Sequence, residues 1–507
     1  MTAATPQFRF WIDMALECVR RDHTASLSPG DQRGPFLTAR ALGMALAAIH
    51  DAKALAEGRP PLLAAPASAG LVGLTGNAAI VAAAAAGSQL LLTRYPHQAG
   101  LLAAAWSQWL ELHDLGAAGS AAEQAGRAFA MAVHFLGPND AMAARSNAYA
   151  PSTPPRPYEH VAPPNQPGQG YAGGAWGSEA PPLLATRPAF PKPPGRVDAT
   201  TVTPTLHYQA DFAHVAAKGY DDRSHGRSAE EELIGIYWGY DGPPELGTPP
   251  RLYMQVVLTV LDDIEARGVN VLSVDDELAV IAGAGIAMAD AGVHAWFYKY
   301  SPDHLMWRPV VGIQQALAPN GTADPTWLPL GRPDTNQPGV NPAMVRIPGT
   351  GLTPDFPAYP SGHATFGAAA FHLLRLFLVE RRQAQFGTQG VDTVDFDFVS
   401  DEYNGRNIDP RNHQPRAVVT RRYPSLWRAI VENSLSRVFL GVHWQFDGLT
   451  RRSKDGTADE FDDRDIDLIR PDRLGQTGGV WLGCQIANQV AARLGVAPAT
   501  IAAGKIV

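Results

Sequence analysis

The distribution of proline is the sequence feature that most restricts how this chain can fold. Residues 151–206 hold a dense run of prolines within a chain that is otherwise rich in alanine and leucine. Proline removes a backbone donor and blocks a helix interior, so this stretch can form neither a helix nor a central strand. Its aromatic residues Tyr158, Tyr171, Trp176 and Phe190 have little use in a free linker. We therefore expect an ordered coil that wraps over a surface of the protein.

The segments on both sides of this coil carry helical patterns. Residues 6–150 form a series of Ala- and Leu-rich patterns, clearest at 38–58. After the coil, helical patterns recur between Gly/Pro loops at 228–240, 251–268, 274–300, 362–387, 423–438 and 477–494. Strand-like alternation is scarce. We predict an all-α fold of two packed four-helix-bundle-like halves joined by long Pro/Gly-rich connections.

The domain organisation follows from these patterns. We predict an N-terminal helical bundle over residues 1–150, a Pro-rich wrapping segment over 151–227, and a C-terminal helical bundle over 228–507 that carries the functional site. The three parts are expected to pack as one compact body, because the wrapping segment has aromatic residues to bury.

Charge and composition exclude several classes of protein. A net charge of -8 argues against a nucleic-acid or membrane surface as the main partner. Only two cysteines occur, Cys18 and Cys484, which are too few for a disulfide framework or a cysteine metal cluster. Asp13 and Glu17 stand where a signal peptide would be apolar, and prolines and polar residues interrupt the uncharged stretch between Arg59 and Arg94. We expect a cytoplasmic protein.

Three short segments combine cationic or hydrogen-bonding side chains with a break in a helix, at 296–312, 354–367 and 436–447. In the first, Lys299 and Arg308 lie on either side of Pro302, which ends the helix. The following Pro309 restricts Arg308 to an extended backbone, so both cations can turn toward one point. Two surface cations beside a turn are the alternative.

The second segment places a histidine at the start of a helix. Pro360-Ser361-Gly362-His363 directly precedes the apolar run 364–378. Ser361 is the expected N-cap, Gly362 permits close backbone approach, and His363 falls in the first turn. Free N–H groups and the positive end of the helix dipole can then bind an anion. An ordinary capped helix is the alternative.

The third segment pairs a histidine with a carboxylate. Gly441 separates Arg437 from His443, which suggests that one helix ends at Arg437 and that a second helical segment carries His443. Asp447 lies four residues further on, where it can hold the imidazole Nδ1–H and leave Nε2 free as a ligand or nucleophile. An ordinary His–Asp surface pair is the alternative.

Taken in order, K-x8-RP, PSGH and SR-x3-G-x-H-x3-D resemble the three-part signature shared by vanadium-dependent haloperoxidases and the type 2 phosphatidic acid phosphatase superfamily. The resemblance is closest to the fungal-type vanadium chloroperoxidases, on residues 237–253, 356–367 and 434–447. Residues 38–52 look like the early bundle helix of the wider family. The family has a shorter spacing between its lysine and arginine, so His304 is an alternative to Lys299.

The resemblance implies a vanadate (V5+) cofactor in the C-terminal bundle, and no haem, flavin or nicotinamide. His443 is then the axial vanadium ligand, and the catalytic residues are His363 and Lys299. The residues implied to bind the cofactor are Lys299, Arg308, Ser361, Gly362, His363, Arg437 and His443. Trp296 and Phe356 match the halide-pocket aromatics of the chloroperoxidases. Asp241 is expected to pair with Arg437, and Asp447 to support His443.

The implied reaction is the oxidation of chloride, bromide or iodide by hydrogen peroxide to hypohalous acid, which halogenates organic acceptors. The expected partners are hydrogen peroxide, halide and a small organic acceptor, with no nucleic acid and no membrane, and a homo-oligomer stays open. The alternative is a soluble acid phosphatase that uses the same pocket, with His443 forming a phospho-histidine and His363 protonating the leaving group. A third possibility is a bundle protein in which the motifs have no catalytic role.

Overall fold

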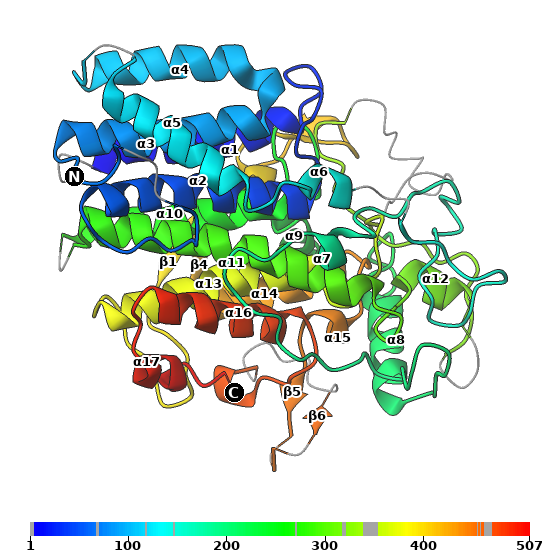
Figure 1. Cartoon of the computed structure of the whole chain (residues 1–507). Coiled ribbons are helices and arrows are strands. Elements are labelled where there is room, and N and C mark those ends of the chain that lie inside the picture. The colour runs from blue at the N-terminus through cyan, green and yellow to red at the C-terminus, as the bar shows by residue number, and fades with distance from the viewer. Residues whose placement is uncertain are drawn as a thin grey trace.

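The computed structural model describes residues 5–66, 70–116, 119–144, 148–268, 271–316, 321–337, 353–453, 455–456, 458–460 and 469–506. Helices dominate it and pack in layers (Figure 1). The N-terminal part contains α1 (Thr5–Asp22), α2 (Pro35–Ala56), α3 (Asn77–Arg94), α4 (Ala99–Leu112), α5 (Ala121–His134) and the short α6 (Asp140–Ala143). The predicted all-α class is confirmed.

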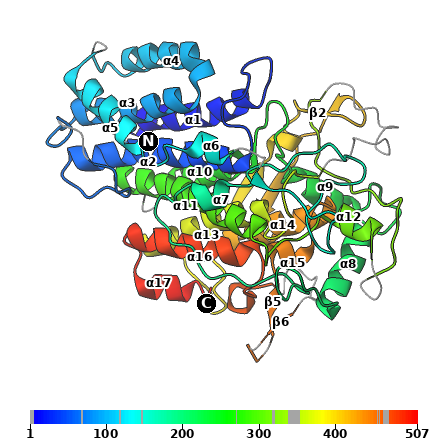
Figure 2. The same cartoon turned by 45° about the vertical axis from the view of Figure 1, so that its right-hand side comes forward.

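Each helical pattern predicted after the Pro-rich segment corresponds to a helix. These helices are α9 (Ala229–Tyr237), α10 (Pro249–Arg267), α11 (Val274–Tyr300), α13 (Gly362–Glu380), α14 (Leu426–Phe439) and α16 (Gly479–Arg493). Shorter helices connect them, namely α7 (Trp176–Glu179), α12 (Pro309–Gln314), α15 (Gln445–Gly448) and α17 (Pro498–Ala503). The long helices gather on one side of the molecule, and α12 lies on the other with most of the coil (Figure 2).

The strands of the described residues form three small antiparallel pairs. β1 (Phe396–Val399) pairs with β4 (Thr420–Tyr423), β2 (Ile408–Asp409) with β3 (Gln414–Pro415), and β5 (Arg451–Arg452) with β6 (Asp459–Glu460). All three pairs are short, as the scarcity of alternating patterns predicts.

The N-terminal helices meet the later ones through close contact between α2 and α11. Gly43 on α2 lies against Gly285 on α11, and a Cβ at position 43 would come 2.6 Å from the Gly285 carbonyl oxygen. Small residues at both positions let the two backbones approach closely, which buries most of each helix. Two helices, α11 and α13, are long and apolar enough to cross a bilayer, but 94% of each apolar stretch is buried inside the protein.

The Pro-rich segment is an ordered coil that packs on the helices. Tyr158 and Trp176 are buried in the common core. Besides the four-residue α7, the predicted wrapping segment contains a longer helix, α8 (Leu206–Lys218), which lies beyond the last prolines and is capped by Thr205. The pattern analysis missed this helix because the proline density upstream dominates the composition of the segment.

A buried carboxylate on α11 fixes the middle of this coil. Asp290 accepts the backbone N–H groups of Leu183 at 2.5 Å, Leu184 at 2.9 Å and Ala185 at 2.7 Å. One turn later, His294 Nε2 donates to the Ala185 carbonyl at 2.9 Å. Three donors on one charged acceptor hold the coil in a single place against the helix.

Replacing Asp290 is therefore expected to release the coil. In Asp290→Asn the amide N–H₂ would face backbone donors, and the free energy of unfolding should fall by about 2 kcal/mol or more because buried N–H groups lose their acceptor. Limited proteolysis should then cut within 151–205 faster than in the wild type. Asp263→Asn, a partly buried position on α10, is the control, and equal cleavage in both variants would contradict the anchoring role.

Candidate active site

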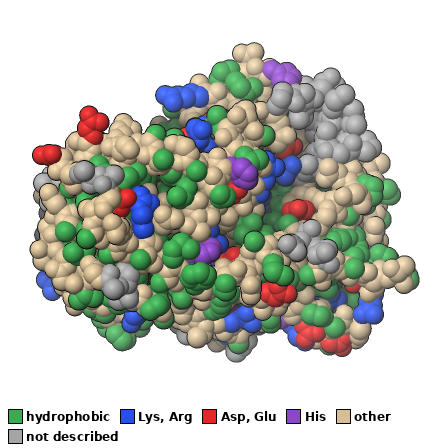
Figure 3. Space-filling view, turned by 45° about the horizontal axis from the view of Figure 1, so that its top comes forward, with side chains coloured by type: hydrophobic (Ala, Val, Ile, Leu, Met, Phe, Trp, Pro, Cys, Tyr) green, Lys and Arg blue, Asp and Glu red, His purple; other side chains and the backbone are tan. Residues whose placement is uncertain are grey.

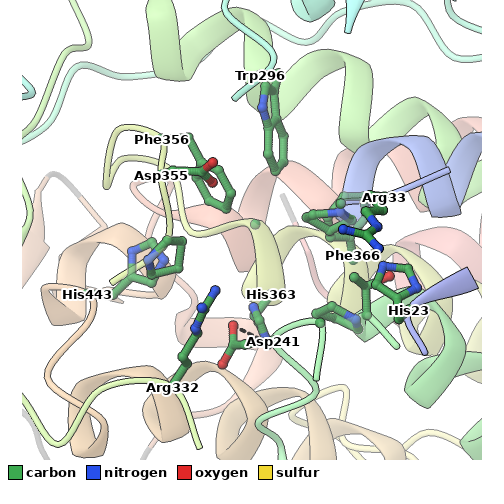
Figure 4. Close-up of a pocket in the computed structure, with 17 residues that line it drawn as sticks. His23, Arg33, Asp241, Trp296, Arg332, Asp355, Phe356, His363, Phe366 and His443 are labelled. Carbon is green, nitrogen blue, oxygen red and sulfur yellow. Dashed lines mark ion pairs between the residues drawn. The ribbon is translucent and has the colours of Figure 1, made fainter. Parts of the chain in front are cut away.

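A cavity of about 390 Å³ lies at the N-terminal end of α13, where this helix faces the loops that precede α2 and α10 (Figure 4). Six of the residues singled out in the sequence line it: Asp241, Trp296, Phe356, Gly362, His363 and His443. They come from four separate segments of the chain. The fold thus brings residues from all three motifs to one place.

The start of α13 forms one wall of the cavity. Ser361 is the N-cap, with an extended backbone (φ -64, ψ 124) and a side chain that accepts the Ala364 N–H at 3.4 Å. Its own N–H donates to the Asp447 carbonyl at 2.7 Å. Gly362 faces the Trp296 ring, and a Cβ there would come 3.5 Å from that ring. The predicted cap is present, and it directs the positive end of α13 toward the cavity.

His363 presents one ring nitrogen to the cavity. Its Nε2 donates to the Gly239 carbonyl at 3.0 Å and lies 3.7 Å from Asp241 Oδ1. Because a carbonyl only accepts, this bond leaves Nδ1 as the basic nitrogen. Burial and the nearby Arg437 guanidinium lower the pKa of His363 to about 3. The ring is therefore neutral near pH 7 and able to accept a proton.

His443 presents the other type of ring nitrogen. Its Nδ1 donates to Asp447 Oδ2 at 2.9 Å, and the same carboxylate oxygen accepts the Trp444 N–H at 2.9 Å. This predicted pair is present, but the backbone prediction was wrong. His443 lies in a turn before α15 and not on a helical segment, because Gly441 (φ 70) redirects the chain after α14.

Arg308 lies against the remaining nitrogen of His443. Its backbone is extended (φ -70, ψ 154) before Pro309, as predicted. Nε donates to the Phe356 carbonyl at 2.9 Å, and Nη1 lies 2.8 Å from the Val442 carbonyl and 2.9 Å from His443 Nε2. Nη2 is buried and makes no hydrogen bond to any described residue. Burial lowers the pKa of this guanidinium to about 9.

Arg437 is the second fully buried guanidinium of the site. Its two terminal nitrogens bind Asp241 at 2.8 and 3.1 Å, so the expected pairing is present as a bidentate contact. Its Nε is buried without a partner within the ranges that the structure describes. Asp241 thus orients Arg437 and leaves one N–H for another acceptor.

Lys299 contacts the loop that leads to α13. Its ammonium donates to the carbonyls of Pro357 at 2.8 Å, Ala358 at 3.2 Å and Pro360 at 2.5 Å. These bonds use its three donors. Lys299, like Arg308, Ser361 and Arg437, is not among the residues that line the cavity. Here it holds the loop that leads to Ser361. The alternative residue, His304, bonds to the Phe190 carbonyl at 3.1 Å and does not line the cavity either.

Two aromatic rings form an apolar wall. The ring centroids of Trp296 and Phe356 are 4.7 Å apart, and Trp296 Nε1 donates to the Ala172 carbonyl at 3.1 Å. Lys299 Nζ lies 5.0 Å from the Phe356 centroid and 5.4 Å from that of Trp296, so its charge also lies close to both rings.

The charge balance of the site suits an anion. Lys299, Arg308 and Arg437 are fully buried, and two carboxylates, Asp241 and Asp447, accompany them. The unpartnered N–H groups of both arginines can donate to the oxygens of a tetrahedral oxyanion, and His443 Nε2 can bond to its central atom. This donor set fits vanadate or phosphate.

Several lining residues were missed from the sequence, namely His23, Arg33, Arg332, Asp355 and Phe366. His23 and Arg33 lie in the loop between α1 and α2, where the sequence indicates only a turn. No motif marks this loop, and only the packing of the N-terminal helices against α11 brings it to the cavity.

Comparison with known proteins agrees with this geometry. Residues 279–453 match the family described as the VCPO second helical-bundle domain. The vanadium chloroperoxidase of Curvularia inaequalis is 34% identical in an alignment of 303 residues that covers 52% of this chain and 47% of that protein. The chain therefore aligns with about half the length of this relative.

Solved structures extend the likeness over the whole fold. A bacterial vanadium-dependent iodoperoxidase has a TM-score of 0.61 at 17% identity, covering 97% of each chain. The holo form of a bacterial vanadium-dependent chloroperoxidase has a TM-score of 0.59 at 14% identity, covering 94% of this chain and 95% of that one. The resemblance to the vanadium-dependent haloperoxidases is confirmed: the chain has their fold, and residues 279–453, which contain all three motifs, match the second helical-bundle domain of the vanadium chloroperoxidases.

Proposed function

We propose that this protein is a vanadium-dependent haloperoxidase, which uses hydrogen peroxide to oxidise halide to hypohalous acid and so halogenates an organic acceptor. One observation carries the proposal: His443, oriented by Asp447, turns Nε2 toward Arg308, and Arg308 Nη2 and Arg437 Nε are buried with no acceptor in the described structure. Such a site favours an oxyanion with a central atom open to a nitrogen ligand. The relatives named above support the choice of vanadate.

The residues that would hold the cofactor follow from the donors at the site. Arg308 Nη2, Arg437 Nε and the start of α13 at Ser361 and Gly362 would bind the oxygens, and His443 Nε2 would bond to the metal. Bound vanadate supplies a Lewis-acid centre at which peroxide reacts without a change in the oxidation state of the metal. Lys299 supports the loop before Ser361, and a direct bond from Lys299 to the oxyanion would require it to release one carbonyl.

His363 would carry the proton transfers. Its neutral ring, fixed by the Gly239 carbonyl, accepts a proton from hydrogen peroxide at Nδ1. The ring then returns this proton to the second peroxide oxygen, and one further proton from solvent completes the water that leaves. Overall, peroxide, halide and one proton yield hypohalous acid and water.

The wall formed by Trp296 and Phe356 would face the halide. Aromatic edges carry partial positive charge and exclude water, which favours a weakly hydrated anion. We propose that chloride, bromide and iodide are all oxidised. The other partners would be hydrogen peroxide and a small organic acceptor. The cytoplasmic location stays a prediction. Whether the protein forms a homo-oligomer stays open.

The proposal predicts vanadate-dependent halogenation. The purified protein, freed of metal, should halogenate a diketone probe with hydrogen peroxide and either chloride or bromide only after orthovanadate is added. Turnover with bromide alone would contradict the halide range proposed for Trp296 and Phe356. The absence of turnover with both halides, together with phosphate-ester hydrolysis that vanadate inhibits, would identify a phosphatase instead.

Substitution of the two histidines should separate cofactor binding from proton transfer. His443→Ala is expected to abolish vanadate binding in equilibrium dialysis, because the axial ligand is lost. His363→Ala should keep the oxyanion and lose turnover by about 10²–10⁴-fold, the usual contribution of a general acid–base group. His97→Ala, at a side chain that is 59% exposed, is the control. Near-normal turnover in either site variant would refute that residue's role.

The pKa of His363 predicts a specific titration. Without a bound oxyanion, its ring should stay neutral as the pH falls until about 3, because burial and Arg437 oppose a positive charge. Bound vanadate should raise this pKa, since negative charge nearby favours the imidazolium. An NMR titration of histidine-labelled protein measures the pKa of His363 without and with bound vanadate. His363→Asn assigns the signal. A midpoint above pH 6 in the ligand-free protein would contradict the prediction.

A further inference from the structure

The cavity continues beyond the oxyanion site, and its outer wall comes from a different part of the protein. His23, Arg33, Gly34 and Pro35 line it from the loop that leads into α2. These residues lie outside the matched range 279–453 and outside all three motifs. The wall is therefore a property of this chain that the signature does not explain.

Arg33 supplies a positive charge with no acidic partner among the described residues. Gly30 (φ 92) makes room for it, because a Cβ at that position would collide with the Arg33 Nε. The glycine thus lets the guanidinium lie over the backbone of the loop. In Figure 4, Arg33 and His23 lie on the side of the cavity opposite His443.

Arg332 adds a second positive charge to the lining. Its Nε donates to Asp334 Oδ1 at 2.9 Å, which fixes the side chain and leaves its terminal nitrogens for another acceptor. Asp334 thus forms an ion pair with Arg332, and Asp241 already binds Arg437 at two points, so Arg33 is the lining arginine without an acidic partner among the described residues. Asp355 is the other acid of the lining, and burial raises its pKa.

The remaining groups suit an aromatic ring with a hydroxyl. Pro35, Pro249 and Phe366 add apolar surface to that of Trp296 and Phe356. His23 Nδ1 donates to the Val19 carbonyl at 2.9 Å, so its Nε2, which is buried without a described partner, is an acceptor for a hydroxyl proton. A volume of about 390 Å³ is enough for a small ring compound. Figure 3 shows a face with a hollow where charged, histidine and hydrophobic side chains meet.

We propose that this outer wall binds the organic acceptor, and that the acceptor is a hydroxylated aromatic acid whose carboxylate binds the Arg33 guanidinium. The inference rests on the proposed haloperoxidase function and names its substrate class. In the reaction, a ring carbon forms a bond to halogen while the O–halogen bond of hypohalous acid breaks. The displaced ring proton and the hydroxide leave together as water.

The test compares a charged acceptor with a neutral one of the same shape. With the vanadate-loaded protein, 4-hydroxybenzoate should have a lower KM than its methyl ester. Arg33→Gln should raise KM for the acid about tenfold more than for the ester, because a charge-assisted contact is lost only with the acid. Arg382→Gln, at an exposed arginine beyond the far end of α13, should leave the ratio of the two KM values unchanged.

Binding to the vanadate-free protein, measured by calorimetry, separates this inference from the proposed function. 4-Hydroxybenzoate should bind the wild type at least about tenfold more tightly than it binds Arg33→Gln. The inference would be overturned if Arg33→Gln changed KM equally for the acid and the ester. It would also be overturned if the wild type and Arg33→Gln bound the acid with equal affinity. Loss of vanadate-dependent halogenation of the neutral ester in the wild type would instead refute the haloperoxidase function, whatever the calorimetry shows.

Discussion

The burial of three cations beside one cavity is the constraint on which the site depends. Removing a charge from water is costly unless other polar groups replace the water. Here the replacements are mostly backbone carbonyls, three around Lys299 and two around Arg308, with Asp241 on Arg437. These carbonyls belong to the loops before α13 and α15. The same bonds that solvate the cations therefore hold the loops that carry the ligand residues.

The two histidines of the site are held in opposite tautomers, and this distinguishes their chemistry. His363 gives its Nε2 proton to the Gly239 carbonyl, and His443 gives its Nδ1 proton to Asp447. Their basic nitrogens are consequently Nδ1 in one ring and Nε2 in the other. The His443 ring has a carboxylate partner, which increases its strength as a ligand. The His363 ring has only a neutral carbonyl, which suits proton exchange.

Sequence reasoning predicts the features that depend on neighbouring residues. The Ser361 cap, the extended Arg308 and the helix patterns are all local, and each is present. The carbonyl partners of Lys299 could not be predicted, because they are contributed by a loop about sixty residues away along the chain. The turn at His443 was missed because a left-handed glycine and a short helix leave only a weak pattern. No pattern in the sequence marks Arg33, because long-range packing brings this residue to the cavity.

The wrapping coil also shapes the active-site wall. The Ala172 carbonyl accepts hydrogen bonds from both Trp296 and Tyr300, and the Tyr158 carbonyl accepts the Trp307 N–H beside Arg308. Together with the α1–α2 loop, these contacts make the cavity a joint product of early, middle and late parts of the chain. The site therefore depends on parts of the chain outside the three motifs. A bundle excised around the motifs would keep the signature and lose the surroundings that position it.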